Sequence, residues 1–493
     1  MGSRSVIIDL VDNRKYCCEC GTIYAEFDDS RKQSLIGSKR PKVSWERPED
    51  WERIATRIKN ARNDRVQSNV YILGEDGYED GAEGLFCVSR RANGFDIQTG
   101  NLVGSIVKKN GDNPADKAIG RISIGSRFGD EFLRYIISDA DGFCSIKDAG
   151  GSEQNPNGYD WLLGYLWNTK FKAAYRLGLP KCYTTKSEKL VSPRGQLDTM
   201  GYYEYPQRGK IGCTYRELSY SNSAAALFVQ AWKVLNKRES TKVFCRPTAN
   251  ISQTFQQALG DERFRRSELL KTKHFTNAFY GEYNDLIDLS KFVLRSWGSD
   301  FSSEAKADAI LFDVSMLFEY YIRKLLNRNG FRMLPKKEER PLDVPTLPLE
   351  GEYRRDMIPD LVFQVDDGMC VFDAKYKNYE PKYGVKREDV FQLHTYIGQY
   401  GNDAPIKACG FIYPIGESKW RKYRNDKTDA VVLNTKMAQQ GREILFCVGF
   451  LVVPDQDEDG KVAQEEFWEK MSQNAQNLAN KLRETIRAGS AQA

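Results

Sequence analysis

Histidine is almost absent from this sequence, which contains only His274 and His394 in 493 residues. So few imidazoles argue against a histidine-rich zinc centre and against a histidine-based catalytic triad. Any chemistry must therefore come from carboxylates, lysines or cysteines.

Long apolar runs are also lacking. None reaches the roughly 18 residues that a membrane helix needs, and the N-terminus returns to charged residues too soon for an export signal. The eleven cysteines are an odd number and mostly isolated, which predicts free thiols in a reducing cytoplasm. For Cys17, Cys18 and Cys20 we expect buried or turn positions rather than zinc binding, because no second pair is suitably spaced. The predictions are a cytoplasmic location and no membrane partner.

A nucleotide-binding P-loop is missing as well, since no G-x-x-x-x-G-K-[ST] sequence occurs. The glycine-rich stretch 74–84 is acidic and is typical of exposed turns. We expect that the chain itself binds no nucleotide. Its 73 basic and 68 acidic residues give a net charge of +5, which permits a nucleic-acid partner without requiring one.

The length predicts two to four domains. Short apolar runs between turn signals favour a β-rich region over 1–150, with an amphipathic helix within 40–62. Apolar residues at helical spacing predict a mostly helical region over 151–300. The expected elements there are helices at 161–177, 224–235 and 282–294, with a strand or turn at 194–198.

The C-terminal part, 301–455, has the pattern helix, hairpin, helix, strands. We expect a helix at 310–326, a connector at 336–352, a helix at 385–400, and strands at 408–413 and 443–453. An acidic linker and an amphipathic helix occupy 456–493. The predicted fold class is multi-domain α+β, with a mixed sheet flanked by helices in the C-terminal domain.

The candidate catalytic residues lie in a predicted β-hairpin of the C-terminal part. Two β-prone runs, 358–365 and 369–377, flank an Asp-Asp-Gly turn. If Asp366 and Asp367 form the loop, Asp360 faces Asp373; if the loop is one residue later, Asp360 faces Lys375. Either register gathers two carboxylates and one ammonium.

Two adjacent carboxylates suit Mg²⁺, and a lysine beside the ion can position an attacking water. Such a site hydrolyses phosphodiesters. The alternative interpretation is a surface hairpin with solvated ion pairs, because these residue types are common on surfaces.

These residues resemble the PD-(D/E)xK nuclease motif: Pro359-Asp360, then Asp373-Ala374-Lys375. The resemblance implies Asp360, Asp373 and the Ala374 carbonyl as metal ligands, and Lys375 as the residue that orients water. Glu319 matches the acidic residue of the preceding helix and would assist the metal, or it is a boundary glutamate. Gln392 and Tyr396, four residues apart, are similar to the Q-x-x-x-Y feature of RecB-like members, although Tyr396 could be a core aromatic.

The segments 360–362 and 372–377 further resemble the McrC family, the nuclease subunit of McrBC-type modification-dependent restriction systems. More diffuse similarity extends over 80–450. Gly125-Ser126-Arg127 departs from the family, which has Pro-Lys at this point. The resemblance implies a Mg²⁺-dependent endonuclease (Mn²⁺ is the alternative ion) that cleaves modified double-stranded DNA and stimulates a McrB-like AAA+ GTPase docked on its N-terminal domain.

Two other functions stay open, namely an autonomous repair or defence nuclease and a non-catalytic GTPase-activating adaptor. Basic residues interleaved with aromatics at 375–386 and 419–424 could contact DNA phosphates, or form solvated faces. Arg194 could act on the partner GTPase, or anchor a turn.

Overall fold

The computed structural model describes most of the chain. The described residues are 6–19, 22–26, 32–34, 48–63, 70–73, 86–92, 94–109, 118–141, 160–197, 209–297, 309–334, 344–345, 354–355, 359–365, 368–380, 382–401, 404–424, 432–439, 442–455 and 464–490. Several residues of the predicted features lie outside this set: Cys20, the stretch 74–84, Asp198, most of the connector 336–352, Asp366, Asp367, and residues 456–459 of the acidic linker.

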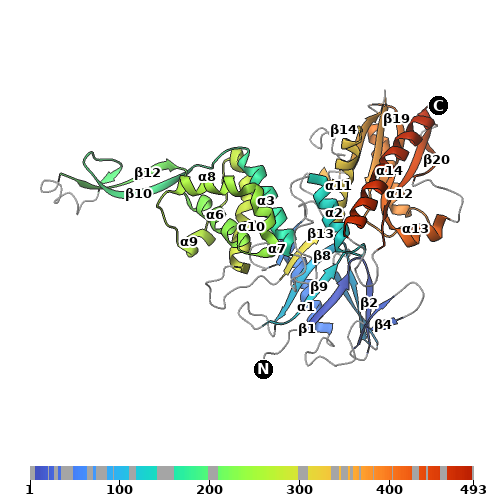
Figure 1. Ribbon diagram of the computed structural model, residues 1–493, viewed down its shortest axis with the longest axis horizontal. Coiled ribbons are helices and arrows are strands. Elements are labelled where there is room, and N and C mark those ends of the chain that lie inside the picture. The colour runs from blue at the N-terminus through green and yellow to red at the C-terminus, as the bar shows by residue number, and fades with distance from the viewer. Residues whose placement is uncertain are drawn as a thin grey trace.

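The N-terminal part contains two five-stranded sheets (Figure 1). The first has the order β1 (Val6–Val11), β9 (Ala118–Gly125), β8 (Leu102–Lys109), β13 (Ala309–Asp313) and β5 (Val70–Leu73). The second has the order β4 (Lys32–Ser34), β3 (Thr22–Glu26), β2 (Lys15–Glu19), β7 (Gly94–Thr99) and β6 (Phe86–Arg91). Helix α1 (Pro48–Asn63) places Trp51 against Phe86 and Phe95 in a separate core, as its amphipathic pattern predicts. Cys17 and Cys18 are buried in β2.

Strand β13 corrects the predicted helix at 310–326. Residues 309–313 pair antiparallel with β8 and parallel with β5, and helix α11 (Val314–Arg328) starts only afterwards. The Asp313 side chain caps the helix by accepting a hydrogen bond from the Ser315 amide at 2.9 Å. A short apolar run is compatible with the 3.6-residue period of a helix and with the two-residue period of a strand. Here, pairing with strands distant in the sequence selects the strand.

The helical middle contains all three expected helices: α3 (Asp160–Tyr175), α6 (Ser223–Asn236) and α10 (Glu282–Trp297). Helix α10 packs against both α6 and α3, and Trp167 donates a hydrogen bond to Ser290 across this contact at 2.8 Å. Three shorter helices complete the bundle: α7 (Glu239–Cys245), α8 (Ala249–Leu259) and α9 (Arg266–Leu270). Helix α2 (Asp130–Asp141) packs against α11 and also contacts α14 of the C-terminal region, so it links the N-terminal part to the C-terminal part.

A β-arm, formed by the described residues 182–197 and 209–219, projects from this bundle away from the rest of the molecule (Figure 1). Strands β10 (Cys182–Leu190) and β12 (Ile211–Ser219) pair antiparallel, and β11 (Gln196–Leu197) joins β12. The expected strand or turn at 194–198 is therefore confirmed for its described residues. The length of the arm is a feature that the sequence analysis did not predict.

The C-terminal sheet has six strands in mixed orientation. Their order is β14 (Arg332–Met333), β17 (Leu361–Val365), β18 (Gly368–Ala374), β19 (Ile406–Gly416), β21 (Arg442–Val453) and β20 (Val432–Gln439). The pairs β18–β19 and β19–β21 are parallel, while β17–β18 and β20–β21 are antiparallel. Strand β20 was not predicted.

Helices cover this sheet, as expected. Helix α12 (Arg387–Tyr400) packs on β18 and β19, and the long helix α14 (Gln464–Ser490) packs on β19, β20 and β21. Helix α13 (Glu417–Arg424) follows β19, and the short pair β15 (Val344–Pro345) and β16 (Arg354–Arg355) stands apart. Every residue of β18 is buried, which explains its continuous apolar sequence. The predicted α+β class is confirmed. Within the described part of the chain, no helix combines the length and apolar character of a membrane span.

Candidate active site

The hairpin register brings the two aspartates together. Leu361 pairs with Phe372, and Val365 pairs with Gly368, so the residue numbers of the partners sum to 733. This is the first of the two predicted registers, and its continuation sets Asp360 opposite Asp373. Asp360 Oδ2 accepts a hydrogen bond from the Ala374 amide at 2.9 Å. Arg323 of α11 donates to the Asp360 carbonyl at 3.1 Å and fixes the backbone there.

Lys375 follows directly on β18. Its Nζ lies 2.5 Å from Asp373 Oδ2, and the side chains of Lys375 and Asp373 are 15% and 2% exposed. The Lys375 amide donates to the Ile412 carbonyl of β19 at 2.9 Å, so the strand end is held by its parallel neighbour. The ion pair is therefore sheltered and built on a rigid strand, unlike a solvated surface pair.

Helix α12 supplies the next contacts. Lys375 Nζ donates to Gln392 Oε1 at 2.9 Å, and Gln392 Nε2 donates to the Tyr396 hydroxyl at 2.7 Å. The spacing of four residues places both side chains on one helix face, as the sequence indicated. Tyr396 is also buried, so it is a core aromatic and a hydrogen-bond partner at once.

Negative charge accumulates around Asp360. Burial raises the pKa of Asp360 well above its ordinary value, and the nearby charges of Asp373 and Glu319 raise it further. Burial alone would lower the pKa of Lys375, but the Asp373 and Asp360 carboxylates hold it above its usual value. Glu319 is half-buried on α11 and close enough to contribute to this field.

The donor set that could hold a divalent cation is small. Among the described residues, no group of three or more His, Cys, Asp or Glu side chains is arranged to hold a metal ion. Two facing carboxylates do suit Mg²⁺, which keeps several of its waters. Buried Asp373 Oδ2 has the Lys375 ion pair but no well-aligned hydrogen bond, and the raised pKa of Asp360 marks poorly compensated charge. Both observations fit a cation between Asp360 and Asp373.

The basic segments lie beside this cluster. Lys377 pairs with Asp389 of α12 at 2.8 Å, and Lys419 pairs with Glu380. Tyr383 is 76% exposed, with Lys382 over its ring at 5.5 Å. In contrast, Arg194 lies on the β-arm, 4.9 Å from the centre of the Tyr215 ring. The structure therefore separates Arg194 from the hairpin cluster.

A second polar cluster borders Lys375 and was missed from the sequence. Asp12 and Ser126-Arg127, at the ends of β1 and β9, meet Tyr376. The departure Gly125-Ser126-Arg127 was the only sequence signal for it, because the partners are about 250 residues apart.

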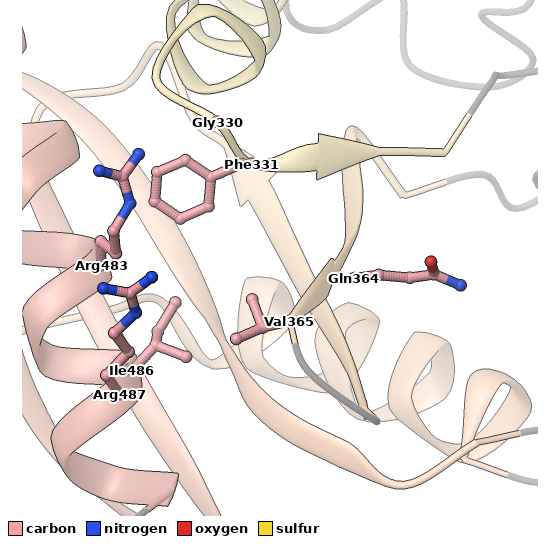
Figure 2. Close-up of a pocket in the computed structure, with 7 residues that line it drawn as sticks. All are labelled: Gly330, Phe331, Gln364, Val365, Arg483, Ile486 and Arg487. Carbon is pink, nitrogen blue, oxygen red and sulfur yellow. The ribbon is translucent and has the colours of Figure 1, made fainter.

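A cavity of about 190 Å³ lies elsewhere, between β14, β17 and α14 (Figure 2). Its lining consists of Gly330, Phe331, Gln364, Val365, Arg483, Ile486 and Arg487. Arg483 and Arg487 flank Phe331 and Val365 in this view, while Gln364 points away. The cavity contains none of the hairpin carboxylates, so it is distinct from the candidate active site.

Fold and site together define a multi-domain α+β protein whose C-terminal mixed sheet presents an Asp–Asp–Lys cluster. A sequence profile for the family described as McrBC 5-methylcytosine restriction system component matches residues 97–414, more than half of the chain. The chain belongs to this family.

Two solved structures are similar. One is a half-complex from a tetradecameric assembly of Thermococcus gammatolerans McrB AAA+ hexamers with bound McrC; it has 15% identity, a TM-score of 0.45, and coverage of 95% of this chain and 100% of that one. The other is the Thermococcus gammatolerans McrBC complex, with 17% identity, a TM-score of 0.31, and coverage of 66% and 88%. A comparison with curated protein sequences finds no match.

Proposed function

We propose that this chain is the Mg²⁺-dependent DNA endonuclease subunit of its restriction system. The observation that carries the proposal is the sheltered Asp360–Asp373–Lys375 cluster on adjacent strands, with Gln392 holding the lysine. The family supplies the context of modified DNA, and 5-methylcytosine is the modification named in its description.

The residues have distinct roles in this proposal. Asp360, Asp373 and the Ala374 carbonyl would hold the cation, and Glu319 would bind one of its waters. Bound Mg²⁺ would lower the pKa of water and stabilise charge on the phosphoryl group. Lys375 has three N–H donors; Asp373 and Gln392 orient two, and the third can point to the attacking water or to a phosphate oxygen. Tyr396 fixes the amide orientation of Gln392.

DNA would cross the site along the basic residues that border it. Exposed Lys382, Lys386 and Arg387 precede or begin α12, close in sequence to Lys375. Their charge would position the phosphate backbone without reading sequence. Recognition of the modified base is then left to the partner.

That partner, in the proposal, is an AAA+ GTPase of the McrB type. The sequence has no P-loop, so nucleotide hydrolysis must be supplied by another chain. Docking would involve the N-terminal region 1–150 and the β-arm. The β-arm exposes four large apolar side chains: Tyr183 and Val191 at 65% and 64%, and Leu197 and Leu218 at 40% and 47%. Tyr183 and Leu218 are direct cross-strand partners, and exposed apolar side chains that lie together in this way mark protein contacts.

The test is cleavage of 5-methylcytosine-containing and unmodified plasmid with Mg²⁺. Wild type and Asp373→Ala are compared, with and without GTP and the McrB-like partner. The expected result is cleavage that requires Mg²⁺, partner, GTP and Asp373. Cleavage by the chain alone would favour an autonomous nuclease. Stimulated GTP hydrolysis without cleavage would favour an adaptor.

A further inference from the structure

The ends of β1 and β9 form a buried polar cluster against Tyr376. Arg127 Nη2 donates to the Tyr376 carbonyl at 2.8 Å, and the guanidinium carbon lies 4.4 Å from the centre of the Tyr376 ring. The Tyr376 hydroxyl is 3.0 Å from Ser126 Oγ. Asp12 Oδ1 accepts from the Arg127 amide at 2.7 Å. Guanidinium, carbonyl and ring are thus held in one arrangement.

This cluster fixes the backbone of Tyr376, the residue that follows Lys375, which is the proposed water-orienting residue. Tyr376 is bonded to Lys375, whose own amide donates to Ile412 of β19. The backbone around Lys375 is therefore held on two sides, by the C-terminal sheet and by Arg127 of the N-terminal sheet. Phe128, Phe132 and Phe318 pack around the Tyr376 ring and leave it little freedom.

Burying the charged groups of this cluster is unfavourable for the stability of the fold. The side chains of Arg127 and Asp12 are 7% and 0% exposed, and their nearest ion-pair distance is 4.0 Å. Arg127 Nε and Nη1 are buried without a hydrogen bond, and Asp12 Oδ2 has no well-aligned one, although the Asp12 carboxyl interacts with the Tyr376 hydroxyl. Apolar residues of similar volume often give equal or greater stability at such positions. What apolar residues could not supply is a donor to the Tyr376 carbonyl.

We infer that Arg127 is a positioning residue for cleavage, which sets Lys375 through the Tyr376 backbone and makes the N-terminal sheet part of the active-site scaffold. The inference rests on the proposed nuclease function. Arg127 acts through Tyr376 and does not itself touch the reacting groups in this assignment.

The main test is the double variant Asp12→Asn/Arg127→Met. It removes both buried charges, so no unpaired charge remains, and it deletes the donor to Tyr376. Arg134→Met is the matched control: Arg134 is also buried, lies 5.2 Å from the Trp161 ring centre, and pairs with Glu131 at 3.8 Å. The measurements are thermal melting, and kcat and KM for DNA cleavage with Mg²⁺, GTP and the McrB-like partner.

We expect the double variant to melt at or above the wild-type temperature, with kcat lowered about 10- to 100-fold and KM within about threefold. Arg134→Met should keep kcat within about twofold. Arg127→Lys, which retains the charge beside Asp12, is the second variant and should lose part of kcat. The two Arg127 variants are the double variant and Arg127→Lys. If either of them is folded and its kcat is within about twofold of the wild-type value, the inference is overturned.

A second readout does not need cleavage. Acetylation of Lys375 at one fixed pH is followed by mass spectrometry, with the more exposed Lys170 as the internal reference. Loss of Arg127 should speed labelling of Lys375 several-fold relative to Lys170, and Arg134→Met should not. Failure of the wild type to cleave DNA would refute the proposed function, whereas unchanged labelling in the Arg127 variants would refute the positioning role.

Discussion

Lys375 lies between an acid and an amide, and this position determines what its replacement should do. Lys375→Met keeps the length of the side chain but removes the donors that reach Asp373 and Gln392. We expect single-turnover cleavage to fall by about 10²- to 10³-fold, the range for loss of one positioned donor to the reacting groups, with DNA binding nearly unchanged. Cleavage rates and DNA binding titrations measure the two effects separately.

Lys386→Met is the matched comparison, because Lys386 is exposed and lies in the adjoining basic segment. Loss of a phosphate contact should raise KM and reduce the salt dependence of binding, with kcat unchanged. Equal kcat losses in the two variants would contradict the special role given to Lys375.

Asp360 should make the protein less stable as pH rises. Burial, Asp373 and Glu319 raise its pKa, so the folded state holds the proton more tightly than the unfolded state. The stabilisation that this gives is complete below the unfolded value of about 3.9 and is lost as pH rises through the folded pKa. Asp360→Asn removes this dependence and can still accept the hydrogen bond from the Ala374 amide.

We therefore expect Asp360→Asn to melt about 2–4 °C above wild type at pH 7.5 without divalent ions, and the gap to shrink towards pH 5. Added Mg²⁺ should stabilise the wild type and narrow the gap, because a ligand of the folded state raises its stability. Thermal melting at both pH values checks this. Asp285→Asn, at an exposed ion pair, should show neither effect; a gap that does not depend on pH would refute the explanation.

At the scale of elements, the close packing of β19 on β21 makes a further prediction. A Cβ at Gly410 would lie 1.8 Å from the Cys447 carbonyl oxygen, and backbone cannot move aside easily. Gly410→Ala should lower the free energy of unfolding by about 3 kcal/mol, as expected for overpacking in a rigid sheet. In Gly449→Ala the Cβ would meet the end of the Leu478 side chain at 3.0 Å, which can shift. Denaturant unfolding should rank the two variants in this order; similar losses would contradict it.

Local sequence signals predicted the geometry of the hairpin and of the Gln392–Tyr396 helix face. The Asp-Asp-Gly sequence limited the hairpin to two registers, both of which bring Asp360 near Lys375, and the observed pairs match the first of them. The four-residue spacing of Gln392 and Tyr396 predicted a shared helix face, and a hydrogen bond joins them. These features depend on neighbours in the chain, where turn chemistry and helical period determine geometry.

Long-range pairing could not be predicted in this way. Strand β13 has an apolar sequence that also fits a helix, and its partners β5 and β8 are more than 200 residues away. The parallel neighbours β18 and β19 are connected through a helix and not through a tight turn. The sequence between them therefore contains no turn signal from which their register could be predicted. Arg127 meets Tyr376 for the same reason, through folding of distant segments.

At the scale of the whole molecule, chain segments that are far apart in the sequence share the same sheets and cores. Strand β13 comes from the chain segment directly before α11, yet it completes the N-terminal sheet. One continuous apolar core joins the helical middle to the C-terminal sheet. The β-arm is the exception, since it leaves this body and exposes apolar side chains (Figure 1). Because the rest of the protein is held together by these shared sheets and cores, we expect it to remain folded when the β-arm is removed.

The variant that tests this replaces residues 183–218 by Asn-Gly, a turn that joins the register partners Cys182 and Ser219 and removes all four exposed apolar side chains of the β-arm. Melting of the remaining protein should be nearly unchanged, because the removed residues form their own hairpin. Stimulation of the partner's GTP hydrolysis should fall at least about tenfold, the loss that follows when a central apolar contact is removed. Steady-state GTP hydrolysis against chain concentration gives both the maximum and the midpoint.

Phe279→Ser is the control, since Phe279 is 55% exposed but lies in the helical middle rather than on the β-arm. It should leave GTP hydrolysis unchanged. If the truncated chain stimulates the partner fully, the β-arm is not the contact, and docking must rest on the N-terminal sheets. Because Arg127 joins those sheets to Tyr376, that outcome would place the partner on the same scaffold that positions Lys375.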